Sequence, residues 1–535
     1  MTPALRLLLV ILAAAWLGSL TVRPLYKPDE ARYAEIAREM VHSGDWVTPR
    51  LNGFKYFEKP PLQYWATAVF FKLFGEHDWT ARLWTALLAL AGAAAAFHAG
   101  NRLAGPPAGI IAAGFLAASP LYLLYGQFNT LDMGVSIFLS IAIFAFALSQ
   151  QRGERHWMWI GWAACAAAVL SKGLIGVVLP MTAVALYVVV TRQWRLLARL
   201  ELVRGGLLFL ALTAPWFIAV SAANKEFAYF FFVQEHLLRF TTTMHQRSQP
   251  AWYFVPILAV GIAPWLFLAL AALTRALRFQ RTAEFSPHLF LALWCVVVFV
   301  FFSASGSKLP GYILPLFPAL AVLAASFALR KGMLVAQALF IAAIGVAIVL
   351  GSSYLPRFGG PQMDAFSRAY VPTLLAAAAI VVGTGLTATA LAWRARPLPA
   401  TAAIAVGMYA AALVAIAGHR VYAPAYTVAP TLAAVKPPPS ADARFYAVDS
   451  YDHTLPWTLR RIVTMVGYKD EFGQAVSWEP GKFIPEVAGF AQRWKDERDA
   501  YAFFSARDYD RLRKELGVPM QEVARGPRYV IVRKP

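Results

Sequence analysis

The sequence predicts an all-α polytopic membrane domain followed by a small soluble α/β domain. Of its 535 residues, 59% are apolar or aromatic and only 15% are charged. The mean hydropathy of +0.53 lies far above that of an ordinary soluble domain. After residue 420 the span-length apolar runs stop and charged residues become frequent. We therefore divide the chain into a membrane domain, residues 1–420, and a soluble domain, residues 421–535.

The apolar windows predict about thirteen membrane-spanning helices, because crossing a hydrocarbon core of roughly 30 Å takes about 20 residues. The windows are 4–22, 79–103, 106–124, 132–149, 157–170, 172–191, 203–222, 252–273, 286–303, 309–328, 331–353, 372–393 and 399–418. A hairpin at Ser171–Gly173 separates the fifth window from the sixth, since one helix over 157–191 would bury Lys172 at its centre. The first window is expected to be a retained helix, because no small-residue cleavage site precedes the charged loop.

Basic residues gather in one set of alternate loops, and such residues are retained on the cytoplasmic side. The set is Arg102, Arg152, Arg155, Arg192, Arg195, Arg199, Arg204, Arg275, Arg278, Arg281, Arg330, Lys331, Arg394 and Arg396. The N-terminus is then cytoplasmic and, with an odd number of spans, the C-terminal domain lies outside. This asymmetry and the anionic head groups of lipids account for the net charge of +20, so we expect no nucleic acid partner.

The soluble domain reads as a small α/β unit. β-rich runs at 444–448, 461–466, 501–504 and 528–532 alternate with helical patterns at 482–497 and 506–516. A proline-rich linker, residues 436–440, precedes them. Nowhere does the chain carry a Gly-rich phosphate loop or a nucleotide fingerprint. Its two cysteines, Cys165 and Cys295, lie inside apolar windows, so the exported parts contain neither a disulfide nor a Cys-based metal site.

The first loop, residues 23–78, is unusually rich in charge, and we interpret it as part of a reaction centre. Asp29 follows the first window, where it either serves the chemistry or caps a helix. Residues 31–41 have the spacing of an amphipathic interfacial helix with ion pairs. Glu58 and Lys59 stand before two prolines that stiffen the chain. The run 62–74 is too short to span and is expected to lie in the interface.

Further polar residues are expected on the same outer side, because alternate loops share a side of the membrane. They are Asp132, Lys172, Glu235, His236, Arg239, His245, Arg247, Ser303, Ser305, Ser307, Lys308 and Tyr312. Glu58, His236 and His245 are weak candidates for a divalent metal site, because their spacing shows no ligand pattern. The predicted chemistry requires no cofactor.

Five motifs carry a family resemblance. They are Asp29-Glu30, Glu58-Lys59-Pro60-Pro61-Leu62-Gln63-Tyr64, Leu131-Asp132, Ser171-Lys172-Gly173 and Ser307-Lys308-Leu309-Pro310-Gly311-Tyr312-Ile313-Leu314-Pro315. The chain resembles the GT-C integral membrane glycosyltransferases. It is most similar to the bacterial 4-amino-4-deoxy-L-arabinose lipid A transferases, and protein O-mannosyltransferases are more distant relatives.

The resemblance implies transfer of this sugar from undecaprenyl phosphate to lipid A at the periplasmic face of the bacterial inner membrane, and thereby resistance to polymyxin and other cationic peptides. It implies catalytic roles for Asp29, Glu58 and Asp132. Residues expected to bind the donor and its phosphate are Lys59, Arg32, Tyr33, Tyr56, Lys172, Lys308 and Tyr312. Asp29 would act as a general base toward a hydroxyl acceptor, or would bind the sugar when the acceptor is an ionised phosphate. A lipid-borne donor agrees with the missing nucleotide fingerprint.

Two alternatives remain at this stage. One is a protein O-mannosyltransferase-like enzyme that uses a polyprenyl-phosphate sugar, and the other is a transporter of lipids or sugars. Carriers place their ionisable groups near the bilayer midplane, whereas the acids here stand at outer span ends. This placement favours an enzyme.

Overall fold

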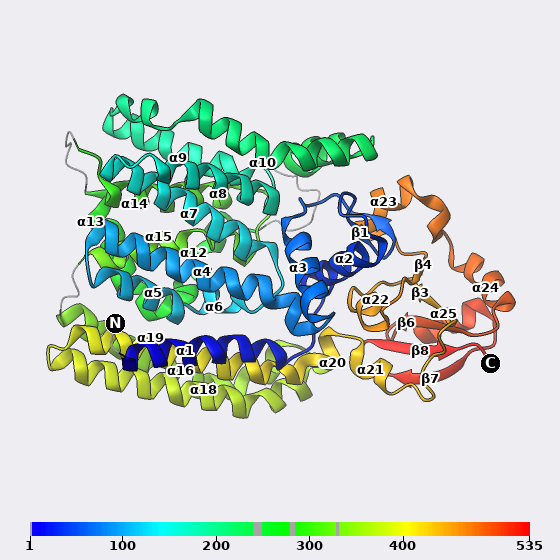
Figure 1. Cartoon of the computed structure of the whole chain (residues 1–535). Helices are drawn as coiled ribbons and strands as arrows, with labels where there is room; N and C mark the ends of the chain where they lie inside the picture. Colours follow the sequence, from blue (N-terminus) through cyan, green and yellow to red (C-terminus); the bar gives the residue numbers. More distant parts are fainter. Residues whose placement is uncertain (1–2, 239–248, 279–283, 328–330) are drawn as a thin grey trace.

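The computed structural model describes residues 3–238, 249–278, 284–327 and 331–535. Figure 1 shows a bundle of long helices with a mixed α/β domain at one end, and the N-terminus lies at the opposite end of the bundle. Helices α2 (Asp29–Ser43) and α3 (Leu62–Phe74) lie between the bundle and the α/β domain. The predicted fold class is confirmed.

Each of the thirteen predicted windows contains helix, but the helices differ in length. Seven are long and apolar enough to cross a membrane, or nine when each sharply bent pair counts as one span, within the described ranges. The seven are α4 (Asp78–Ala104), α7 (Leu131–Arg152), α10 (Leu202–Ala223), α14 (Pro287–Ala304), α16 (Lys331–Gly351) with its extension α17 (Leu355–Phe358), α18 (Pro361–Trp393) and α19 (Pro397–Gly418). Four windows hold shorter helices: α1 (Pro3–Gly18), α8 (His156–Lys172), α9 (Ile175–Thr191) and α15 (Leu316–Ser326). The count of thirteen spans stays a prediction.

Two windows that the sequence predicts as single spans are broken. Helices α5 (Ala108–Ala118) and α6 (Pro120–Gly126) meet at 72°, and α12 (Phe254–Gly261) and α13 (Leu266–Leu277) meet at 75°. Proline lies at both breaks, as Pro120 and Pro264. Its missing N–H and its ring interrupt a helix, which explains why an apolar window alone does not give a straight span.

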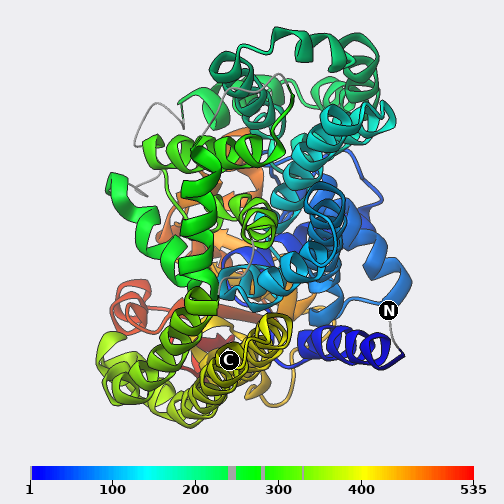
Figure 2. The ribbon, with the colours of Figure 1, turned by 90° about the vertical axis from the view of Figure 1, so that its left-hand side faces the viewer.

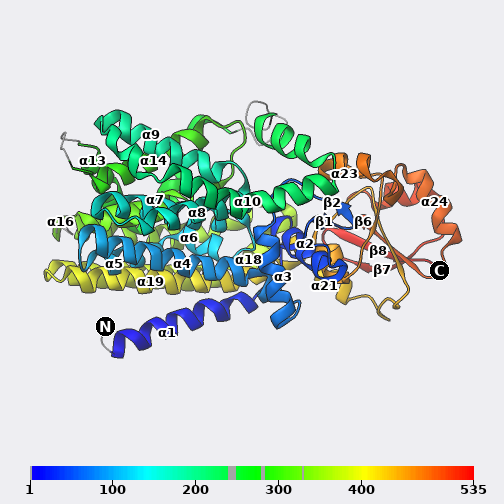
Figure 3. The same cartoon turned by 45° about the horizontal axis from the view of Figure 1, so that its top comes forward.

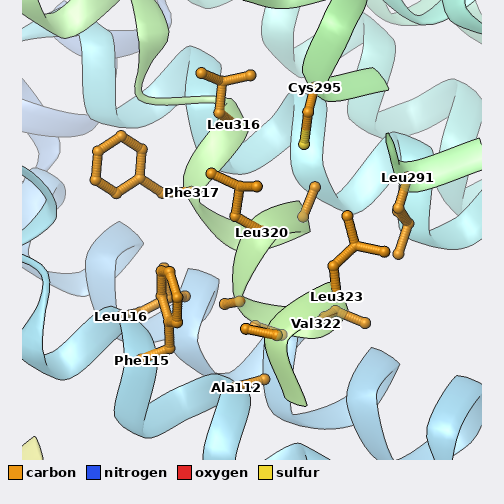
Figure 4. Packing of buried hydrophobic residues seen from close by; sticks show 14 of the residues in the cluster. Ala112, Phe115, Leu116, Leu291, Cys295, Leu316, Phe317, Leu320, Val322 and Leu323 are labelled. Carbon is orange, nitrogen blue, oxygen red and sulfur yellow. The ribbon is translucent and has the colours of Figure 1, made fainter. Parts of the chain in front are cut away.

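Helix α15 forms the centre of the bundle. Its Leu316, Phe317 and Leu320 are buried against Phe115 of α5 and Cys295 of α14, as Figure 4 shows. Figure 2 looks along the bundle from the end opposite the α/β domain and shows α1 at its edge. There the side chains of residues 7–11 are 38–63% exposed, as expected for a helix that faces lipid.

The C-terminal domain contains a six-stranded sheet in the order β5-β4-β3-β6-β8-β7. Its strands are β3 (Arg444–Val448), β4 (Thr464–Val466), β5 (Phe483–Ile484), β6 (Ala500–Ser505), β7 (Gln521–Arg525) and β8 (Tyr529–Arg533). Strands β3 to β6 pair in parallel, whereas β6, β8 and β7 pair antiparallel. Helices α24 (Val487–Asp496) and α25 (Tyr509–Leu516) occupy the two predicted helical stretches.

Helix α2 is the main contact between the two parts. It packs against α3 and against α22 (Thr454–Leu459) of the C-terminal domain, and residues 30–40 are buried. Arg38 donates through Nε to Glu35 at 2.8 Å. The expected ion pair therefore forms, but the prediction of an interfacial helix over 31–41 is wrong, because the C-terminal domain covers this face. The interfacial prediction suits α3 better, since its Leu73 and Phe74 are 65% and 50% exposed.

Beyond α2, the first loop forms a two-stranded hairpin, β1 (Arg50–Leu51) and β2 (Phe54–Lys55). Figure 3 shows this hairpin beside α23 (Gly473–Trp478) of the C-terminal domain. Asn52 at its tip exchanges two hydrogen bonds of 2.8 Å with the backbone of Val463. The first loop and the C-terminal domain thus share one packed layer.

Candidate active site

A cavity of about 690 Å³ lies where α2, the ends of α7 and α8, and the C-terminal domain meet. The predicted site residues that line it are Asp29, Arg32, Tyr33, Tyr56, Glu58, Lys59, Asp132, Lys172 and Tyr312. Lys308 does not line it, although its neighbour Leu309 does. The Lys308 ammonium is buried and donates to the carbonyl of Ser305 at 2.6 Å. Its role as a donor-binding residue stays a prediction.

Asp29 is the first residue of α2, and Pro28 occupies the N-cap position. The cap interpretation of Asp29 is therefore wrong. Its carboxylate is 39% exposed toward the cavity and accepts a hydrogen bond of 3.4 Å from Nη1 of Arg32. The carboxylate thus stands open to a ligand while one guanidinium holds it from the side.

Glu30, the next residue, points the other way. Its carboxylate is buried and accepts from Arg23 Nη1 at 2.5 Å and from Arg82 Nε at 2.7 Å. Burial alone would raise the pKa of Glu30, but the two guanidiniums outweigh burial and lower it to about 2. Glu30 is therefore an ionised anchor that ties α2 to α4.

Lys59 lines the cavity, and a neighbouring carbonyl and a distant acid in the sequence hold its ammonium. Its ammonium donates to the carbonyl of Glu58 at 2.6 Å and to Oε2 of Glu235 at 3.1 Å. The Glu58 carboxylate accepts from the Tyr56 hydroxyl at 3.1 Å. Burial, followed by the charge of Glu58, raises the pKa of Tyr56 well above its ordinary value, so this hydroxyl remains a neutral donor.

Asp132 and Lys172 form a close ion pair between the start of α7 and the end of α8. The Lys172 ammonium also lies 4.4 Å from the centre of the Tyr312 ring. The topology places these three residues on one side of the membrane domain, and the structure brings them into contact. Tyr312 and Lys172 are thus held together in the lining of the cavity.

The C-terminal domain supplies cavity residues that sequence reasoning missed. They are His453, Tyr468, Asp470, Glu471, Phe472, Gly473, Gln474, Ala475 and Trp478. Glu471 accepts from Arg32 Nη2 at 2.6 Å. The run Asp470-Glu471-Phe472 carries no local motif, so only the docking of the domain on α2 reveals its place. The π-helix η3 (Tyr229–Leu238) adds Phe230, Gln234 and Glu235 to the lining.

Within the described residues, acids hold the basic side chains that line the cavity in ion pairs. These pairs are Arg32–Asp29, Arg32–Glu471, Lys59–Glu235, Lys172–Asp132 and Lys55–Glu226. Cations fixed in this way can donate to the oxygens of a phosphate when it replaces an acidic partner, without moving far. The cavity therefore places Arg32, Lys59 and Lys172, three cations that can donate to a phosphate, in the same lining as the open carboxylate of Asp29.

Metal ligands do not gather within the described residues, where no group of three or more His, Cys, Asp or Glu side chains could hold an ion. Glu58 lines the cavity. His245 lies outside the described residues, as do Arg239 and Arg247, and the described part of η3 includes no side-chain placement for His236. The metal hypothesis for these three residues stays untested.

Two family models match the chain. The aminoarabinose transferase C-terminal domain matches residues 431–534, and the dolichyl-phosphate-mannose-protein mannosyltransferase model matches residues 58–218. Among solved structures, ArnT from Cupriavidus metallidurans bound to undecaprenyl phosphate is 37% identical, covers 100% of this chain and 98% of its own, and superposes with a TM-score of 0.94. Its apo state is 36% identical, with 99% and 98% coverage and a TM-score of 0.91.

Curated relatives agree over a shorter stretch. The undecaprenyl phosphate-alpha-4-amino-4-deoxy-L-arabinose arabinosyl transferase of Shewanella sediminis is 35% identical over 319 residues, 58% of this chain and 57% of that protein. The protein of the same name from Pseudomonas aeruginosa strain PAO1 is 35% identical over 326 residues, 59% of this chain and 58% of its own. The alignments thus span less than two thirds of these relatives.

A polytopic helical bundle, capped by an α/β domain over a cavity of paired acids and bases, defines the class of GT-C integral membrane glycosyltransferases. Within this class, the chain belongs to the aminoarabinose transferase family, ArnT. The resemblance drawn from the five sequence motifs is confirmed.

Proposed function

We propose that the protein transfers 4-amino-4-deoxy-L-arabinose from undecaprenyl phosphate to a phosphate group of lipid A. The observation that carries the proposal is the convergence of Arg32, Lys59 and Lys172 with the open carboxylate of Asp29 in one cavity. Support comes from the full-length similarity to a structure of ArnT bound to undecaprenyl phosphate. The names of the curated relatives support the sugar.

In this reaction an oxygen of the acceptor attacks the anomeric carbon of the sugar, and the C–O bond to the carrier phosphate breaks. The electron pair of that bond leaves on the phosphate oxygen, where Lys59 and Arg32 stabilise the developing charge. A lipid A phosphate is already ionised near neutral pH, so the attack needs no proton removal. Asp29 then binds the sugar and its cationic amine, and Tyr33 is a neutral hydroxyl donor for sugar oxygens. The Tyr56 hydroxyl donates to Glu58 and can accept from a sugar hydroxyl.

The proposed setting is the inner membrane of a bacterium, with the N-terminus in the cytoplasm and the C-terminal domain in the periplasm. The arginine-rich alternate loops support this orientation. The cavity then opens at the periplasmic face, where both lipid substrates are found. Modified lipid A carries less negative charge, so we expect the activity to confer resistance to polymyxin and other cationic antimicrobial peptides.

Mass spectrometry of lipid A tests this proposal. Cells that carry the gene should show an aminopentose on the lipid A phosphates, and cells without it should lack this addition. Purified protein in detergent should perform the same transfer between the two lipids. Because detergent micelles have no compartments, product formed there excludes pure transport. Unchanged lipid A in both experiments would contradict the proposal.

We also propose that the transfer requires no cofactor. The C–O bond that breaks and the bond that forms need no redox step, and Lys59, Arg32 and Lys172 supply the positive charge at the phosphate. Enzyme dialysed against EDTA should keep its turnover within about twofold, less than ~0.5 kcal/mol of barrier. Loss of activity that added Zn²⁺ or Mg²⁺ restores would contradict this and direct attention to Glu58, His236 and His245.

A protein O-mannosyltransferase-like activity is the second candidate. The match of residues 58–218 to the dolichyl-phosphate-mannose-protein mannosyltransferase model favours it. For a protein hydroxyl, Asp29 would have to remove a proton. Sugar that appears on a protein, with lipid A unchanged, would support this candidate and overturn the first.

A further inference from the structure

The C-terminal domain reaches the active site at one short segment. Glu471, in the 3-10 turn η9 (Asp470–Phe472), and His453, just before α22, line the same cavity as Asp29 and Arg32. Arg32 donates through Nη2 to Glu471 at 2.6 Å, and its Nη1 lies 3.4 Å from Asp29. His453 Nε2 contacts the other Glu471 oxygen and lies 3.2 Å from Arg32 Nη2.

These contacts hold the Arg32 guanidinium on the side of the C-terminal domain. Its side chain is only 8% exposed, compared with 19% for Glu471 and 11% for His453. With a proton on Nε2, the His453 ring donates to Glu471 and holds that carboxylate in place. Burial lowers the pKa of Arg32, but the surrounding Tyr56, Glu471 and Asp29 outweigh burial and raise it, so the guanidinium stays charged.

We propose that Glu471 and His453 are positioning residues, through which the C-terminal domain orients the Arg32 guanidinium toward the phosphate of the lipid-linked donor. This inference rests on the proposed function and adds a role for the C-terminal domain. An arginine has many rotamers, and its planar fork binds phosphate well only when its plane is set. Loss of the contact with Glu471 would move the Arg32 guanidinium away from both the phosphate and Asp29.

Glu479 provides a matched control on the same domain. Its side chain is 15% exposed, close to the 19% of Glu471, and it too joins the C-terminal domain to the first loop. It accepts from Arg50 Nη1 at 3.0 Å and from the backbone N–H of Lys55 at 3.0 Å, away from Arg32. Glu479→Gln therefore weakens domain docking without touching the guanidinium.

The test uses the full-length protein with the aminoarabinose donor and lipid A, and measures kcat, the KM for the donor, and the binding of undecaprenyl phosphate alone. We expect Glu471→Gln to lower kcat/KM about tenfold to a hundredfold, as misplacement of a positioning group does, and to weaken undecaprenyl phosphate binding. Glu471→Asp should recover part of the loss. Glu479→Gln should stay within about twofold of the wild type. Equal losses in Glu471→Gln and Glu479→Gln would overturn the proposal.

A charge exchange tests whether the ion pair alone, without a guanidinium at position 32, is enough for transfer. Arg32→Glu combined with Glu471→Arg can rebuild the ion pair between the domains, so thermal stability should return toward that of the wild type. Transfer should stay absent, because the guanidinium now stands on the wrong side of the cavity. Recovered transfer would overturn the proposal.

Two further measurements keep the inference testable. If Glu471→Gln does not fold, His453→Gln takes its place in the experiment, and the KM for the donor should rise severalfold. An unchanged KM in His453→Gln would overturn the proposal. Selective loss of undecaprenyl phosphate binding in Glu471→Gln, but not in Glu479→Gln, supports positioning whichever sugar is transferred. A wild-type protein that binds this lipid but transfers no aminoarabinose overturns the proposed function alone.

Discussion

Asp29 and Glu30 are neighbours in the chain, yet they belong to two different regions of the molecule. Glu30 lies in a closed cluster with Arg23 and Arg82, where it also accepts from the backbone N–H groups of Tyr26 and Asn129. Asp29 opens on the cavity and has one long contact with Arg32. A saturated, buried acid stabilises the fold, whereas an acid with unused hydrogen-bonding capacity remains available to a ligand.

The same difference separates the cations of the two regions. Arg82 spreads its guanidinium over Glu30 and three backbone carbonyls, those of Leu20, Arg23 and Pro24. Lys59 instead pairs with Glu235 and Lys172 with Asp132, and both lysines border an open space. A phosphate can enter beside the lysines but not beside Arg82. Substitutions in the two regions should therefore separate activity from stability.

The largest effect is expected at Asp29. Asp29→Asn removes the charge that faces the sugar but keeps the size of the side chain, so transfer should fall by about a thousandfold, the upper end for losing one preorganised charge contact. Thermal unfolding should remain at the wild-type temperature, because the carboxylate makes one long contact. Steady-state turnover of the purified variant checks this, and near-normal turnover would remove Asp29 from the reaction.

Glu30→Gln should give the opposite result. It leaves Arg23 and Arg82 buried beside a neutral amide, and breaking a buried ion pair in this way costs about 3–5 kcal/mol of stability. The molecules that do fold should keep their turnover. Thermal unfolding with parallel activity per folded molecule measures both. Wild-type stability with lost activity would reverse the roles assigned to the two neighbours.

Lys59→Ala should slow transfer about a hundredfold to a thousandfold, since losing one preorganised contact to developing charge costs about 2.7–4 kcal/mol of barrier. Lys59→Arg should recover only part, because a planar fork does not replace a compact ammonium beside two prolines. Lys72→Ala, on the neighbouring helix α3 and away from the cavity lining, is the control and should act like the wild type. If Lys59→Ala slowed transfer by less than about threefold, ~0.7 kcal/mol of barrier, Arg32 or Lys172 would be the residue that binds the leaving phosphate.

Much of the fold could be predicted from the sequence, because apolar length reports directly on membrane helices. Helix α3 has the predicted bounds of 62–74. The breaks at Pro120 and Pro264 were not predicted, since the hydropathy of a window does not report whether its helix bends. The buried position of α2 was also missed, because its charges look like those of a surface helix until the C-terminal domain covers them.

The candidate site divides in the same way. Motif residues such as Asp29, Lys59 and Asp132 could be named, and the structure brings them to one cavity. Lys308 lies outside the cavity lining, because its ammonium turns to the Ser305 carbonyl, a contact that a motif does not show. Glu471 and His453 could not be found at all. They lie more than 420 residues after Arg32, and only tertiary contacts connect them.

The smallest expected effect concerns a third acid of α2, Glu39, and its response to pH. Burial, followed by the nearby charge of Glu35, raises the pKa of Glu39 to about 8, opposite to the shift of Glu30. A glutamate in the unfolded chain titrates near ~4.3. The folded protein therefore binds this proton more tightly, and the resulting stability is complete below pH ~4.3 and is lost as the pH rises toward 8. Glu39→Gln should remove this slope, because its amide is neutral throughout and can still accept from the Gly53 N–H. Thermal unfolding of the wild type and Glu39→Gln between pH 5.5 and 8 checks this, and an equal dependence of stability on pH in both would contradict it. Glu30→Gln should leave the pH dependence in this range unchanged, because the Glu30 contribution is lost only as the pH falls below ~4.3 toward its pKa of about 2.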